Sequence, residues 1–122
     1  MNTRWSSVSN ISRNKVDLAD LLAQHISGLR LPRGEREHRP FPDRRFRLDL
    51  AWPNLKLYVE VDGGELMQGR HNRAAGMASD CEKMALLTLD GWRGFRFVGS
   101  QVKSGFAIAM LERWFHLHPP IA

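Results

Sequence analysis

The chain is poor in cysteine and has no long apolar run. Its 122 residues include a single cysteine, so no disulfide forms within the chain, and a reducing, cytoplasmic compartment is expected. One cysteine and five scattered histidines do not predict a closed Cys/His zinc site. A membrane-spanning helix needs about 20 consecutive apolar residues, and no such run is present. The N-terminus also lacks the apolar core of a signal peptide, so we expect no membrane partner.

Acidic residues are also in short supply relative to basic ones. Eighteen Lys and Arg stand against thirteen Asp and Glu, which gives a net charge of +5 and a pI near 10.1. Such a balance favours an anionic partner, nucleic acid first, although solubility alone also accounts for it. Hydrophobic residues make up 43% and charged residues 25%, as in ordinary globular proteins. We expect a flexible polar arm over residues 1–14 and a single domain over 15–122.

Two segments with alternating apolar residues occupy the middle of the chain. Residues 46–52 and 57–64 each alternate with a period of two, as half-buried strands do, and the short break between them predicts a hairpin. Each strand carries acids on the face opposite its apolar residues: Asp49 on the first, and Glu60 and Asp62 on the second. These acids need an explanation, because Asp is depleted in strands.

The length of the hairpin loop decides which residues face each other. A two-residue loop pairs Asp49 with Tyr58, and a four-residue loop pairs Asp49 with Glu60; both keep the apolar faces together. In either register Asp49 and Glu60 are neighbours on one face. Directly opposite side chains have Cβ atoms about 5 Å apart, a separation at which like charges repel. Such carboxylates share a proton, hold a cation, or meet a basic side chain such as Arg45 or Arg47.

The most basic stretch is residues 30–47, with seven arginines and three prolines. The prolines predict an extended or looped conformation, with a strand starting near His38. The planar fork of arginine matches phosphate, so this stretch predicts a phosphate-binding border beside the carboxylates, with a merely solvated loop as the alternative. The candidate phosphate-contacting residues, here and in the loop after the hairpin, are Arg36, Arg39, Arg45, Arg47, Arg70 and Arg73.

The order of elements predicts the fold class. Apolar residues recur at helical spacing over 16–29, 74–89 and 101–116, and a further strand is expected over 92–98. With a strand near His38, the order is helix, three strands, helix, strand, helix. A lone strand reached through a helix predicts an α/β fold with a mixed four-stranded sheet and helices on both faces.

The helix over 74–89 and the loop before it border the hairpin. On an ideal helical wheel the buried stripe of this helix consists of Met77, Cys81, Met84, Ala85 and Thr88. Lys83 falls on the far side and is therefore predicted to be solvated. The preceding loop is rich in glycine and carries Arg70, His71 and Arg73, so it is able to fold around a ligand.

Five pieces of the sequence, in this order, carry a resemblance to a known family. The pieces are 45–53, 57–64, 69–73, 80–83 and 91–97. Together they resemble the PD-(D/E)XK nuclease superfamily, and in particular its small Vsr-like branch of very-short-patch-repair endonucleases and related phage and bacterial proteins. The resemblance implies a restriction-endonuclease-like fold with an αβββαβ core. It also implies an endonuclease that hydrolyses DNA phosphodiester bonds with Mg²⁺, for which Mn²⁺ is expected to substitute.

The resemblance assigns the carboxylates to a metal site. Asp49 and Glu60 would be the metal ligands, and the main-chain carbonyl of Val61 would complete the site. Mg²⁺ prefers oxygen ligands, keeps several waters and would bridge the two repelling carboxylates. A bound cation of this kind acidifies water and stabilises charge on the leaving oxygen. Glu37 would match a further acid found at the start of the conserved region in related nucleases.

The sequence departs from the family pattern at its lysine position, which holds Asp62. Either Asp62 is an extra metal ligand, or the cationic role has moved to His71, Arg73 or Lys83. The helical wheel argues against Lys83, whereas His71 and Arg73 lie on the loop. His71 is also a candidate general base or phosphate ligand.

Three functions are compatible with these features. The first is a metal-dependent DNA endonuclease that nicks or recognises a DNA structure. The second is a non-catalytic nucleic-acid-binding module on the same fold, because the lysine position is altered. The third is a protein adaptor whose basic face meets an acidic partner. A small nuclease domain that cuts both strands has to work as a homodimer, so the first function implies either a homodimer or nicking.

Overall fold

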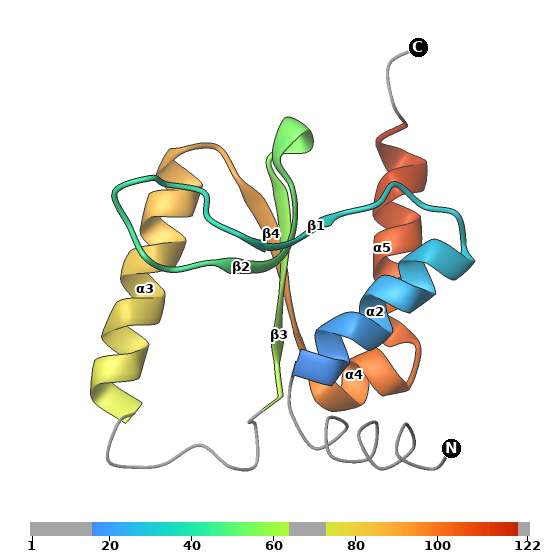
Figure 1. Cartoon of the computed structure of the whole chain (residues 1–122), viewed down its shortest axis with the longest axis horizontal. Helices are drawn as coiled ribbons and strands as arrows, with labels where there is room; N and C mark the ends of the chain where they lie inside the picture. The colour runs from blue at the N-terminus through green and yellow to red at the C-terminus, as the bar shows by residue number, and fades with distance from the viewer. Residues whose placement is uncertain (1–15, 64–72, 120–122) are drawn as a thin grey trace, which may run out of the picture. The chain divides into compact units, whose positions relative to one another are not determined.

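The computed structural model of the chain describes residues 16–63 and 73–119 (Figure 1). The elements are α2 (Val16–Gly28), β1 (Glu35–His38), β2 (Leu48–Trp52), the 3-10 turn η1 (Pro53–Leu55), β3 (Leu57–Asp62), α3 (Arg73–Leu89), β4 (Arg93–Val98), α4 (Gly99–Lys103) and α5 (Phe106–Leu117). The predicted α/β class with a four-stranded mixed sheet is confirmed. Within the described ranges, no helix has the length and apolar character needed to cross a membrane.

The strands lie in the sheet in chain order, β1-β2-β3-β4. Strand β2 is antiparallel to both β1 and β3. The register pairs Trp52 with Leu57, so the four-residue alternative for the hairpin loop is the one observed. Lys56 closes this loop in the left-handed region, with φ of 49°. The Arg93 amide donates to the Lys56 carbonyl at 2.8 Å, so β4 begins beside the start of β3 and runs parallel to it.

The strand expected to start near His38 instead ends there. Strand β1 covers Glu35–His38, and His38 pairs with Leu48 at the first residue of β2. The prolines at positions 40 and 42 lack the backbone N–H that a sheet ladder requires, so the pairing stops before them. The same prolines keep the basic stretch after β1 in a loop, as predicted.

The described residues form two compact units, and β3 and β4 each continue from one unit into the other. The first unit contains helices α2, α4 and α5, which contact one another. Their buried apolar side chains are Ala19, Leu22, Ile26, Val102, Ala107, Leu111 and Phe115. The predicted continuous helix over 101–116 is wrong: Gly105, with φ of 89°, separates α4 from α5. Only a residue without a side chain adopts that φ at little cost.

The second unit contains β1, β2, α3 and most of β3 and β4. Its hydrophobic cluster joins Leu48 and Ala51 of β2 to Leu87 of α3 and to Trp92, with Phe41 and Tyr58 packed against it. Leu87, whose side chain is buried in this cluster, holds α3 against it, and burying one leucine side chain stabilises a protein by about 2 kcal/mol. The predicted arm over 1–14 lies outside the described residues, and the single domain over 15–122 stays a prediction.

Candidate active site

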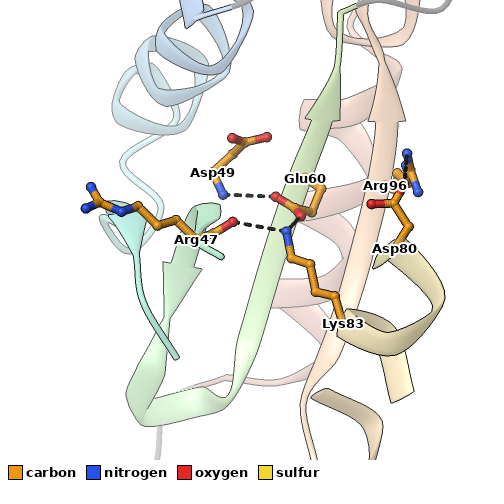
Figure 2. A network of polar contacts seen from close by, with 6 residues as sticks. All are labelled: Arg47, Asp49, Glu60, Asp80, Lys83 and Arg96. Carbon is orange, nitrogen blue, oxygen red and sulfur yellow. Dashed lines mark hydrogen bonds and ion pairs between the residues drawn. The ribbon is translucent and has the colours of Figure 1, made fainter. Parts of the chain in front are cut away.

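The two candidate acids occupy facing positions on β2 and β3. Leu50 pairs with Val59 and Ala51 with Tyr58, so one further step along the ladder places Asp49 opposite Glu60. The Asp49 N–H donates to Glu60 Oε2 at 3.1 Å (Figure 2). Both residues are half-buried. The alternation of the sequence therefore predicted the pair correctly, and the loop conformation selected the register.

Lys83 reaches the same carboxylate from α3. Its Nζ forms an ion pair with Glu60 Oε1 and donates to the Arg47 carbonyl at 3.0 Å (Figure 2). The two paired side chains are only 18% and 21% exposed, so water and salt screen their attraction weakly. In Figure 2 the Arg47 guanidinium points away from Glu60. The cation that neutralises Glu60 is thus Lys83, and Arg47 contributes its main-chain oxygen.

The prediction that Lys83 is solvated is wrong, because α3 turns the opposite face toward the sheet. Leu87 is buried and Lys83 half-buried, whereas Met77 is 60% and Met84 52% exposed. The other members of the predicted buried stripe, Cys81, Ala85 and Thr88, are exposed as well.

The reversed orientation has a physical reason. The helix has apolar residues on two sides, so hydrophobicity alone does not choose between them. An acid buried without a cation destabilises a protein by several kcal/mol. Glu60 therefore favours the orientation of α3 in which the side that carries Lys83 faces the sheet. Leu87 packs on that same side.

Two further ion pairs hold α3 at this edge of the site. Arg44, in the loop before β2, contacts Glu82 at 2.6 Å, and Arg96 of β4 contacts Asp80 at 3.3 Å. All four side chains are substantially exposed, so each pair contributes no more than about 1 kcal/mol. Their main effect is to orient the helix turn that carries Lys83. Sequence reasoning did not assign these pairs to the site, because no local pattern links residues so far apart in the chain.

The aromatic side chain of Tyr58 lies next to Glu60 on the same face of β3. Its ring lies edge-on to Trp92, with centroids 6.3 Å apart. A Cβ atom at position 94 would lie 2.0 Å from the Tyr58 ring, so Gly94 is what lets the ring cross β4. Burial raises the pKa of Tyr58 above its ordinary value of 10.0, the nearby Glu60 carboxylate raises it further, and Arg96 partly opposes both.

Tyr58 is the only tyrosine in the chain, so its titration is directly observable by ultraviolet absorbance. We expect its ionisation midpoint above 10.0, a lower midpoint in Glu60→Gln, and a higher one in Arg96→Met. The folded state retains the phenol proton longer than the unfolded state does. The free energy of unfolding should therefore decrease as the pH rises above the pKa of the tyrosine in the unfolded chain. A wild-type midpoint at or below 10.0 would contradict this arrangement.

The structure separates the candidate arginines by their contacts. Arg36 donates to the Asp49 carbonyl at 3.2 Å and braces β2. Arg39 donates to the carbonyls of Pro42 and Arg44, so it holds its own loop. Arg45 and Arg47 have exposed side chains. Arg73 is the first residue of α3, and Arg70 and His71 lie outside the described residues.

The other candidate metal ligands take varied positions. Val61 is buried and Asp62 half-buried, at the end of β3. Glu37 is exposed and its backbone has a φ of 54°. The register places it opposite Asp49. Over residues 16–63 and 73–119, no group of three or more His, Cys, Asp or Glu side chains is placed to hold a metal ion. The roles of Asp62 and Glu37 in metal binding stay predictions.

The assembled site is therefore a carboxylate pair with one lysine. Asp49 and Glu60 come from adjacent strands, and Lys83 comes from the helix that follows them. Searches of protein-family models, of curated proteins and of solved structures found no match to this chain. Its function is consequently inferred from the chemistry of these side chains.

Proposed function

We propose that this protein is a divalent-cation-dependent endonuclease that hydrolyses phosphodiester bonds in DNA, on a restriction-endonuclease-like fold. The observation that carries the proposal is the Lys83–Glu60 ion pair beside Asp49. The strand position where the resembling family has lysine holds Asp62, and α3 brings an ammonium group to the neighbouring carboxylate instead. Glu60 and Lys83 are in side-chain contact, and Asp49 occupies the facing position on the neighbouring strand. Two acids and an amine so grouped are suited to metal-assisted hydrolysis of a phosphodiester.

The donor set fits a hard divalent cation. Asp49, Glu60 and the Val61 carbonyl would hold it through oxygen atoms, as Mg²⁺ and Mn²⁺ prefer. Each Glu60 oxygen accepts one bond here, and a carboxylate oxygen has two acceptor positions, so coordination does not require the lysine to leave. When bound, the cation would generate a hydroxide from water and stabilise the leaving oxygen.

Lys83 would contact the scissile phosphate. Its ammonium has three N–H donors, and two of them point at Glu60 and at the Arg47 carbonyl. The third would donate to a non-bridging phosphate oxygen and stabilise the negative charge that grows there in the transition state. The two fixed bonds remove the rotational freedom of a long side chain, so the ammonium is held in place before the substrate binds.

The exposed arginines beside the site would position the DNA. Arg45 and Arg47 lie in the loop that leads into β2, close in sequence to Asp49. Phosphate contacts of this kind fix the register of the duplex without reading bases. Together with the net charge of +5, they favour DNA as the partner. The substrate would be recognised by its structure or nicked on one strand.

The test is incubation with supercoiled, linear, single-stranded and branched DNA in Mg²⁺, Mn²⁺ or EDTA. We expect cleavage of at least one substrate with either cation and none with EDTA. Salt-dependent DNA binding without cleavage in any metal would favour the non-catalytic binding module instead. If the protein neither binds nor cleaves any of these substrates, a function on DNA is rejected.

A further inference from the structure

The outer face of α3 is apolar and exposed. This face comprises Met77, Ala78, Cys81, Met84, Ala85 and Thr88, all exposed, which lie on one side of the helix. None of them carries a charge. The two methionines have 60% and 52% of their surfaces in water, so the helix presents an uncharged, largely apolar strip over residues 77–88. Apolar strips of this kind on a protein surface mark interaction sites.

We propose that the outer face of α3 binds the same face of a second copy of this chain, with the two helices antiparallel and the two-fold axis at Cys81. In a two-fold interface, each patch has to complement itself. The inference does not depend on the proposed nuclease function, because it concerns the opposite side of α3 from Lys83.

The sequence of the outer face meets this condition. In an antiparallel pair centred on Cys81, residues at equal distances before and after position 81 face each other. Met77 then meets Ala85 of the second copy, and Met84 meets Ala78. Each long side chain lies against a short one, which lets two helices interdigitate at the usual separation of about 8–10 Å. A partner of unrelated sequence would not require this symmetric order.

The charges beside the axis are also compatible with self-association. Asp80 and Glu82 precede and follow Cys81. In the pair, Asp80 of one copy would therefore lie near Glu82 of the other. Arg96 already contacts Asp80 and Arg44 already contacts Glu82 within one chain. The rim of the interface is therefore made of neutralised pairs and does not repel.

The size of the contact predicts a weak dimer. Helix α3 has 17 residues and is therefore about 25 Å long. A single helix pair of that length lies at the small end of specific protein interfaces, which bury about 1,200 Å² or more in total. We expect a dissociation constant in the micromolar range.

Analytical ultracentrifugation over a concentration series, without DNA or metal, tests the proposal. We expect wild type to shift from monomer to dimer, and Met84→Glu to weaken the association by roughly tenfold or more, because it places a carboxylate in a dry contact. The matched control is Leu117→Glu, at an apolar position of α5 that is 65% exposed, which should leave the association unchanged. Wild type that stays monomeric, or equal effects of the two variants, would overturn the proposal.

Cross-linking measures the orientation independently of any folding defect. Cys81 is the only cysteine, so a short bis-maleimide should join two wild-type copies and should fail on Cys81→Ser. Thr88→Cys in the Cys81→Ser background should not cross-link, because the antiparallel pair separates the two positions by about 20 Å. Efficient linking through position 88 would indicate parallel helices and reject the proposed axis. Monomers whose Cys81 resists the reagent would show that another segment of the chain covers the face, which also rejects it.

Discussion

Replacing Lys83 with methionine should lower cation-dependent DNA cleavage by about 100-fold or more, the usual effect of removing one group that stabilises transition-state charge. Methionine keeps most of the length of the side chain and removes only the ammonium. Glu60 and the Arg47 carbonyl both contact this amine. No other described lysine takes its place at Glu60. DNA binding should change little, because one of many cationic contacts is lost. Initial cleavage rates and binding isotherms, measured on the same preparations, separate the two effects.

Lys103→Met is the matched control for this substitution. Lys103 is an exposed lysine at the end of α4, so its variant has the same loss of net charge and should cleave normally. Lys83→Arg restores a cation with a different shape and should recover part of the activity. Normal cleavage by Lys83→Met would remove the lysine from the site, and a parallel loss in Lys103→Met would indicate a nonspecific effect of charge.

Asp49→Asn and Glu60→Gln should each abolish cleavage, but their effects on stability should differ. The first removes a charge that repels the Glu60 carboxylate across the strands and leaves the Lys83–Glu60 ion pair in place. The second leaves the Lys83 ammonium in a half-buried place without its carboxylate. We expect Glu60→Gln to lower the free energy of unfolding by about 1–3 kcal/mol, less than the value for a fully buried pair. Chemical denaturation measures both, and a nuclease assay gives the activities.

The double variant Glu60→Gln, Lys83→Met completes a thermodynamic cycle. Both partners are then neutral, so the double variant should be more stable than the sum of the two single changes predicts, by about 0.5–3 kcal/mol of coupling. Additive effects would mean that the ion pair is absent in solution. Full activity in either Asp49→Asn or Glu60→Gln would reject the assignment of the carboxylates to the site.

The sequence by itself was sufficient for strands β2, β3 and β4 and for placing the two acids on one face of the hairpin. Alternation with a period of two places Asp49 and Glu60 on one face under any register that keeps the apolar residues together. It left two loop lengths open, since both satisfy that condition. The observed conformation, with η1 and a left-handed Lys56, then selected direct opposition. The strand expected to start near His38 was misplaced, because β1 ends at that residue, before the prolines at positions 40 and 42.

Only the tertiary structure decided which side of α3 faces the sheet. Helical periodicity identifies residues that share a face, but it ranks the faces by hydrophobicity, and this helix has one strip with two methionines and another with two leucines. The choice depends on Glu60, whose half-buried charge needs a cation. Glu60 lies 23 residues before Lys83 in the chain. Lys83 satisfies that charge, so the more obvious apolar strip is left in water. The attraction between two charges depends on their distance in space, which the local pattern of the helix does not contain.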